Sequence, residues 1–123
     1  MVTSPVTVVP IQQIFDIAQA RSALRTKIVQ QRWPIMFNAR AAAVLTALGE
    51  LILEGHDTQC VVKIEIIANA PRCGVRLHTI FQMTEEMPIQ WEQRKLNLRI
   101  AAADTNIHEL GKKVEVTTYV WLD

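Results

Sequence analysis

The sequence predicts an α+β two-layer sandwich, in which a mixed, mostly antiparallel sheet carries three helices on one face. Apolar residues recur at helical spacing in three segments of the chain and at every second position in others, so both helices and half-buried strands are expected. The strands follow one another in runs rather than alternating strictly with helices, which is typical of an antiparallel sheet. The expected order is strand, helix, helix, strand, strand, helix, strand, strand.

An edge strand and a first helix are expected at the start of the chain. Residues 6–11 are rich in β-branched side chains and include a proline, which suits the edge of a sheet. Asp16 is expected to cap a helix that stops near Trp33 and Pro34, because the residue before a proline is pushed out of helical geometry. The apolar stripe of this helix consists of Ile17, Ala20, Leu24 and Ile28.

A second helix and a hairpin should form the middle of the domain. The helix is expected from about Asn38 to Gly55, and it is apolar on most sides, so it should be buried on more than one of them. The period then changes to two at residues 62–66, and residues 69–74 have turn chemistry. The inner face of the returning strand should consist of Val75, Leu77, Thr79 and Phe81.

A third helix and a final hairpin complete the expected fold. Pro88 is placed to open the helix, which should run to about Asp104. Its apolar positions are Trp91, Leu96, Ile100 and Ala103. The hairpin should turn at Gly111 and Lys112, and its last strand should share one face through Val114, Val116, Thr118, Val120 and Leu122.

Composition and charge predict one cytoplasmic domain over residues 1–123. The chain is too short for two cores, and its formal net charge of +1 gives no long-range attraction to nucleic acid or to an anionic membrane. The basic residues are scattered through the chain, no apolar run approaches the roughly 20 residues of a membrane span, and a secretory leader is not expected. We therefore expect no nucleic-acid and no membrane partner.

Four short stretches, spread over nearly the whole chain, resemble one family. Residues 15–21 are similar to a Trp-Asp-Ile-x-x-Ala-Arg motif that opens a first helix, and Ala39, Arg40, Thr46 and Leu48 fall in step on the second helix. Residues 74–77 match the strand before a nucleotide loop, and residues 119–122 resemble a Lys-Trp-Leu ending. On these residues the chain resembles the GHKL, or histidine-kinase-like, ATPase domains, and most of all the bacterial anti-sigma-factor serine kinases. The resemblance implies their fold, in the order βααββαββ.

The positions that bind nucleotide in that family hold unsuitable residues here. A catalytic Glu and a magnesium-binding Asn on the second helix correspond to Ala47 and Leu51 in the ungapped alignment. The Asp-x-Gly-x-Gly motif, whose Asp binds adenine, corresponds to Phe81, Met83 and Glu85, and no glycine-rich lid follows. The resemblance therefore implies a pseudokinase with a degenerate nucleotide site, no cofactor and no metal.

An alternative alignment keeps an active enzyme open. Shifting the second helix by three residues places Glu50 at the catalytic Glu and Glu54 at the magnesium-binding Asn. The chain would then be an ATP-dependent serine kinase with an atypical site, in which Glu50 is the base and Glu54 holds magnesium. The simpler interpretation is that the two glutamates form a charged rim on an apolar helix. No histidine or cysteine spacing in the sequence matches a known metal motif.

The aromatic residues near the end of the chain predict a protein interface. Tyr119 and Trp121 alternate with the inward-facing residues of the last strand, so they should lie on the sheet face away from the helices, where Val61 and Ile67 also fall. An exposed apolar patch there would mark a partner surface, unless a tail or loop covers it. The predicted function is a non-catalytic regulatory domain that binds a sigma factor, an anti-sigma antagonist or a second copy of itself. A structural subunit of a larger assembly is the remaining alternative.

Overall fold

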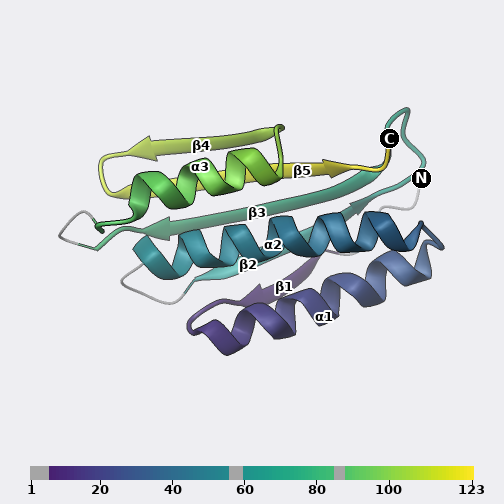
Figure 1. Ribbon diagram of the computed structural model, residues 1–123, viewed down its shortest axis with the longest axis horizontal. Helices are drawn as coiled ribbons and strands as arrows, with labels where there is room; N and C mark the ends of the chain where they lie inside the picture. Colours follow the sequence, from purple (N-terminus) through teal and green to yellow (C-terminus); the bar gives the residue numbers. More distant parts are fainter. Residues whose placement is uncertain (1–5, 56–59, 85–87) are drawn as a thin grey trace.

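The structure, a computed structural model, describes residues 6–55, 60–84 and 88–123, and it has the α+β architecture that the sequence predicts (Figure 1). Three helices and five strands are present in these residues. In chain order they are β1 (Thr7–Pro10), α1 (Ile14–Gln30), α2 (Ile35–Gly55), β2 (Val61–Ile67), β3 (Gly74–Gln82), α3 (Trp91–Ala101), β4 (Thr105–Leu110) and β5 (Lys113–Trp121).

The strands form one sheet in the order β1-β2-β3-β5-β4, and every neighbouring pair is antiparallel. The expectation of a mixed sheet is therefore wrong for the residues described. Two successive helices bring the chain back to the end of the sheet at which β1 finished, so β2 runs against β1. The single crossover helix α3 makes β3 and β4 run the same way, but β5 inserts between them, and no parallel neighbours result.

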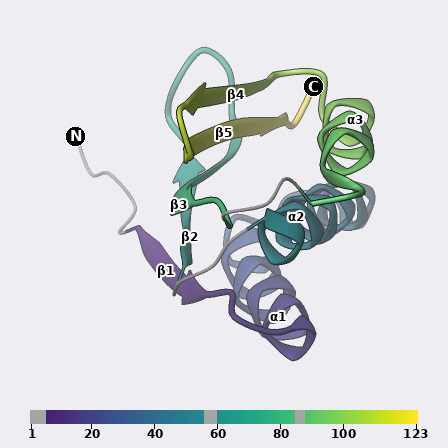
Figure 2. The same cartoon turned by 90° about the vertical axis from the view of Figure 1, so that its left-hand side faces the viewer.

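All three helices cover the same face of the sheet, and the other face carries none of them (Figure 2). The predicted stripe of α1 is confirmed, because Ile17, Ala20, Leu24 and Ile28 are its buried residues. The predicted inner faces of β3 and β5 are confirmed as well, since Val75, Leu77, Thr79 and Phe81 are buried, as are Val114, Val116, Thr118 and Val120. Burying these apolar side chains between the two layers is the main force that holds helices to sheet.

Helix α2 is the central helix of the covering layer. Its 21 residues are long and apolar enough to cross a membrane, so the expectation that no segment reaches that length and composition is wrong for α2. A buried core helix meets the same criteria, and α2 packs against α1, α3, β3 and β5.

The first two helix boundaries differ from the sequence prediction. Helix α1 begins at Ile14, and Asp16 lies inside its first turn, where its carboxylate accepts hydrogen bonds from the backbone N–H groups of Gln12 (2.8 Å) and Gln13 (3.2 Å). Helix α2 starts at Ile35 rather than near Asn38, because the Pro34 carbonyl already accepts the first helical hydrogen bonds.

The buried face of helix α3 agrees with the prediction only in part. Trp91 is buried as predicted, but Leu96 and Ile100 are exposed. Lys95 and Leu98 are buried in their place. Lys95 is a long, amphipathic side chain that buries its methylene groups and keeps its ammonium group paired, so a charged residue can lie on the packed face.

Candidate protein-binding surface

The side chains at the predicted nucleotide positions are part of the hydrophobic core. Leu51 is fully buried, and Phe81 and Met83 are each 4% exposed, within one continuous cluster that joins the sheet to α2 and α3. Ala47 is half-buried and packs against this cluster. Glu85 lies outside the described residues. Ala47, Leu51 and Phe81 therefore place apolar side chains where the resemblance assigns Glu, Asn and Asp.

Phe81 packs against Trp91 at the end of α2. The two rings meet edge to face, with centroids 6.0 Å apart, and the Trp91 Nε1–H donates to the Glu109 carboxylate at 3.1 Å. A Cβ atom at Gly55 would lie 2.6 Å from Trp91 Cζ3, so a glycine is needed there to admit the indole ring. These close contacts make the junction of α2, β3 and α3 a packed region.

The two glutamates of the kinase alternative share one arginine. Arg94 of α3 forms ion pairs with Glu50 (3.5 Å) and with Glu54 (3.4 Å), and all three side chains are partly exposed. The structure therefore brings Glu50 and Glu54 together on one face of α2, as the sequence predicts. A guanidinium group lies against both carboxylates, which suits the charged-rim interpretation better than a free metal site.

Lys95, Glu92 and Glu109 form a further ion-pair network, between α3 and β4, that was not predicted from the sequence. The Lys95 side chain is buried, and its Nζ atom lies 2.9 Å from a carboxylate oxygen of both Glu92 and Glu109. The hydrogen bond from Lys95 lowers the pKa of Glu109, with a smaller contribution from Trp91. Burial is the largest single influence on Lys95 and lowers its pKa, but the hydrogen bonds and the charge attraction to the two glutamates together outweigh it, so the pKa of Lys95 is raised. Only the three-residue spacing of Glu92 and Lys95 could have been noticed in advance.

The four predicted interface residues lie on the open face of the sheet, but they do not form one patch. Val61 and Ile67 stand at opposite ends of β2. Ile67 lies in the same cross-strand row as Trp121, because both pair with Gly74. Val61 instead lines a depression of about 210 Å³ together with Ile80. The open face therefore has two separate apolar areas, of which only one contains the aromatic pair.

Polar pairs occupy the middle of the open face and separate the two areas. Arg76 forms an ion pair with Glu65 at 3.5 Å. His78 Nε2 lies 2.8 Å from Glu115, and this hydrogen bond lowers the pKa of the Glu115 carboxyl. Glu65 and Arg76 are directly opposed in the register of β2 and β3, whereas His78 and Glu115 are diagonal neighbours on β3 and β5. Polar cross-strand pairs of both kinds stabilise a sheet modestly.

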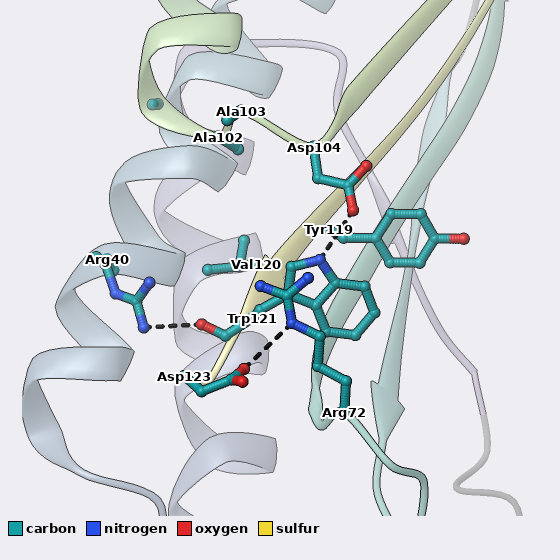
Figure 3. Close-up of a pocket in the computed structure, with 10 residues that line it drawn as sticks. Arg40, Arg72, Ala102, Ala103, Asp104, Tyr119, Val120, Trp121 and Asp123 are labelled. Atoms are coloured by element: carbon teal, nitrogen blue, oxygen red, sulfur yellow. Dashed lines mark hydrogen bonds and ion pairs between the residues drawn. The ribbon is translucent and has the colours of Figure 1, made fainter.

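Trp121 is the centre of the apolar area that contains the aromatic pair (Figure 3). Its ring stacks on Tyr119, with the planes 3° apart and the centroids 5.1 Å apart, and the Arg72 guanidinium lies 4.6 Å from its centroid. The indole Nε1–H donates to Asp104 at 2.8 Å, and Arg72 pairs with Asp123 at 3.2 Å. The two rings are half-buried, so this stack is ordered by neighbours while part of each ring remains accessible.

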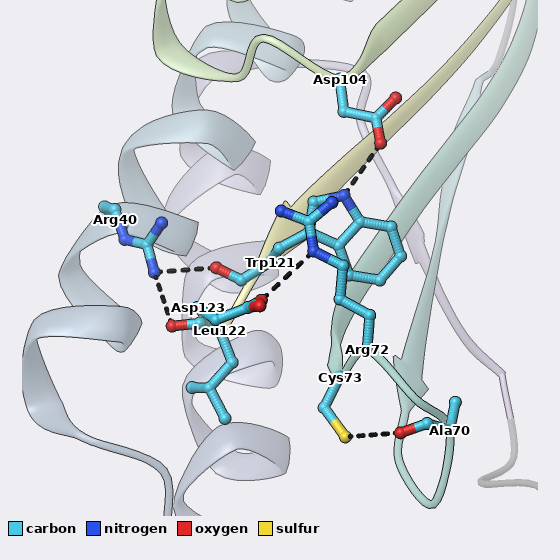
Figure 4. Close-up of polar contacts among 8 residues, drawn as sticks. All are labelled: Arg40, Ala70, Arg72, Cys73, Asp104, Trp121, Leu122 and Asp123. Carbon is cyan, nitrogen blue, oxygen red and sulfur yellow. Dashed lines mark hydrogen bonds and ion pairs between the residues drawn. The ribbon is translucent and has the colours of Figure 1, made fainter.

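The backbone of the last strand is fixed to α2 beside this stack (Figure 4). Arg40 donates to the Trp121 carbonyl at 2.8 Å and to the Leu122 carbonyl at 3.4 Å. A side chain at Gly74 would collide with the Val120 carbonyl, so β3 and β5 approach closely only because residue 74 is glycine. Arg40 and the stack line an open cleft of about 500 Å³. The resulting site combines a rigid aromatic surface with two cations and two carboxylates.

The described residues contain no group of three or more His, Cys, Asp or Glu side chains placed to hold a metal ion. Cys60 and Cys73 are free thiols. Burial raises the pKa of the Cys60 thiol, whose Sγ atom lies 3.0 Å from Thr79 Oγ1. The most developed polar and aromatic arrangement is therefore the one around Trp121, and its chemistry suits recognition better than covalent catalysis.

No protein-family model matches the chain, and no curated protein matches its sequence.

Proposed function

We propose that this protein is a non-catalytic regulatory domain, of the type of the anti-sigma-factor kinases, that has lost ATP binding and binds another protein through the open face of its sheet. The observation that carries the proposal is the packing of Phe81 and Leu51 in the core. At the positions that the resemblance assigns to adenine and magnesium binding, these side chains are buried among apolar residues, where a charged ligand would lose its hydration without a polar partner in return.

The neighbouring carboxylates support the same proposal. A magnesium ion between Glu50 and Glu54 would have to displace the Arg94 guanidinium from both of them. Through their ion pairs with Arg94, the two carboxylates instead help to join α2 to α3. An active kinase is therefore less well supported than a binding domain.

The surface proposed to bind is the aromatic area around Tyr119 and Trp121. Tyrosine, tryptophan and arginine are the residues that carry most of the binding energy at protein interfaces, and Arg72 completes such a set here. The contacts that hold the rings in place reduce the entropy lost on binding. The partner classes follow from the resemblance: a sigma factor, an anti-sigma antagonist or a second copy of this chain.

A nucleotide titration tests the loss of ATP binding. Isothermal calorimetry with ATP and with ADP, each in the presence and absence of magnesium, should show no heat of binding at micromolar nucleotide. Magnesium-dependent micromolar binding would overturn the proposal in favour of the kinase. Arg94→Ala is the informative variant, because it frees Glu50 and Glu54 and should still not create nucleotide binding while Phe81 and Leu51 fill the site.

Aromatic substitutions test the binding surface. Trp121→Ala and Tyr119→Ala should weaken self-association, measured by analytical ultracentrifugation, or binding to a purified sigma factor or antagonist, while the circular dichroism spectrum stays unchanged. Val61→Ala, in the separate apolar area, is the matched control and should bind as the wild type does. Unfolding of both aromatic variants would place the rings in the core and contradict the proposal. Isolation only as part of a large stable assembly would favour the structural-subunit alternative.

A further inference from the structure

The corner between α1 and α2 carries a second exposed apolar surface, on the helical layer of the domain. Val29 is 61% exposed, Ile35 79% and Met36 75%. Trp33 lies between them in the chain, half-buried, with its ring edge-on to Phe37 at a centroid distance of 5.3 Å. Large apolar side chains that gather at one exposed place usually mark an interaction site.

This corner is concave. A cleft of about 400 Å³ lies between the last turn of α1 and the first turn of α2, and Ile28, Val29, Trp33 and Ile35 provide its apolar lining. A cleft of this size can take one or two projecting side chains. A projecting apolar side chain is a feature of a peptide segment rather than of a lipid surface.

Arg25 and Arg32 line the same cleft and give it a positive charge. Among the described residues, neither guanidinium group has a hydrogen bond or an ion pair with another side chain. The surrounding sequence is one-sided as well: between Asp16 and Glu50 stand Arg21, Arg25, Lys27, Arg32 and Arg40, and no acidic residue. The balanced net charge of the chain conceals this basic segment, so the expectation of scattered basic residues does not hold for the helical hairpin. Carboxylates are the natural partners for such a surface.

The backbone conformation of Arg32 is a further reason to consider this cleft a binding site. Arg32 has a φ of 59°, in the left-handed region, and it follows Gln31, the C-cap residue of α1. Glycine is favoured at this position of a helix end, and an arginine there has a conformational cost. A side chain that is kept at a strained position next to a cleft is a candidate for function.

We propose that the α1–α2 corner is a docking site for a peptide segment of another protein in which an apolar side chain is flanked by Asp or Glu. The apolar side chain enters the cleft between Val29 and Trp33, and the flanking carboxylates pair with Arg25 and Arg32. This cleft shares no lining residue with the cleft beside Trp121, so different variants test the two proposals.

A set of synthetic peptides, each titrated into the protein in solution, tests this proposal directly. The central residue is varied among Leu, Phe and Ser, and the flanking residues among Glu, Ser and Lys. Binding is followed by the ¹⁵N chemical shift of the Trp33 indole in the full chain. Peptides with an apolar centre and Glu flanks should bind and shift this resonance, whereas the Ser-centred and Lys-flanked peptides should not. Equal binding of the Ser-centred acidic peptides, or no binding by any peptide, would overturn the proposal.

Charge variants locate the peptide. Arg25→Glu combined with Arg32→Glu should weaken binding by about tenfold or more, because two attractive charge pairs become repulsive. Lys63→Glu makes the same type of change on the open sheet face and should leave the affinity unchanged. If Lys63→Glu weakens binding equally, the peptide lies on the sheet and the corner is not its site.

Arg32→Gly separates binding from stability. It removes the guanidinium group but suits the left-handed backbone, so it should raise the thermal midpoint while weakening peptide binding. Asn69→Gly is the matched control, because Asn69 has a φ of 61° at a turn outside the cleft, and the affinity of this variant for the peptide should stay that of the wild type.

Vesicles of phosphatidylserine test whether the corner binds a membrane surface instead. Binding to vesicles without binding to any peptide would replace the peptide site with a membrane-surface site.

Discussion

The two faces of the sheet use their aromatic residues in opposite ways. On the helix-covered face, Phe81 and Trp91 are buried, meet edge to face, and direct their one polar group to Glu109. On the open face, Tyr119 and Trp121 stack flat on each other and are half-exposed beside Arg72 and Asp104. The first pair fills space in the core, whereas the second presents accessible ring surface. The contrast indicates which part of the domain maintains the fold and which part is available to a partner.

Phe81→Ala should have the largest effect in this comparison. Removing the ring leaves a cavity against Trp91 and Gly55, which costs about 3–5 kcal/mol in unfolding free energy. Chemical denaturation with urea measures the change. Phe15→Ala is the control on α1, where the ring is 60% exposed, and it should cost less than about 0.5 kcal/mol. A cost below about 1 kcal/mol for Phe81→Ala would show that the ring is not a core element.

Trp121→Ala should have an intermediate effect on stability. It removes the stack on Tyr119, the contact with Arg72 and the hydrogen bond to Asp104, each of which is partly solvated, so about 1–2 kcal/mol is expected. Trp121→Phe keeps an aromatic ring but loses the Nε1–H donor, and comparison of the two variants isolates that hydrogen bond. If Trp121→Ala costs as much as Phe81→Ala in urea, the distinction between the two faces is wrong.

The pH dependence of stability should differ least, but still measurably, between the two faces. Glu109 under α3 and Glu115 on the open face both have a lowered pKa in the folded protein. Their stabilisation is fully present above the ordinary carboxyl pKa of 4.5 and is lost as the pH falls through the lowered folded value. Glu109→Gln should therefore reduce the acid-induced fall of the thermal midpoint.

The matched substitution Glu115→Gln should reduce that fall less, because solvent screens an exposed pair more strongly. Thermal midpoints at pH 3 and pH 6 for the two variants and the wild type make the comparison. An equal change in both variants would mean that the Lys95 network gains nothing from its burial.

The sequence indicated the fold class and most element faces because a local period carries that information. The four buried residues of α1 recur at helical spacing, and the inner faces of β3 and β5 recur at every second position, so each could be assigned without knowledge of its neighbours. The buried face of α3 could not be assigned in this way. Lys95 is buried only because Glu92 and Glu109 come together around it, and Glu109 belongs to another element.

The candidate site shows the same division. The outward orientation of Tyr119 and Trp121 follows from the alternation of β5, and the exposed half of each ring agrees with it. The separation of Val61 from this pair does not follow from alternation, because it depends on the register with which β2, β3 and β5 align. Likewise, the contact of Arg94 with Glu50 and Glu54 depends on the way α3 lies against α2.

The amino-acid sequence by itself determined which segments are helices and strands, which side chains of α1, β3 and β5 face inward, and the apolar character of the positions at Leu51 and Phe81. Tertiary structure alone decided that the sheet is wholly antiparallel in the described residues, that Trp121 is held by Arg72 and Asp104, and that Arg25 and Arg32 share one cleft. The physical reason is the range of the forces involved. Periodicity and propensity act between near neighbours in the chain, whereas register, helix packing and the grouping of charges depend on residues that only folding brings together.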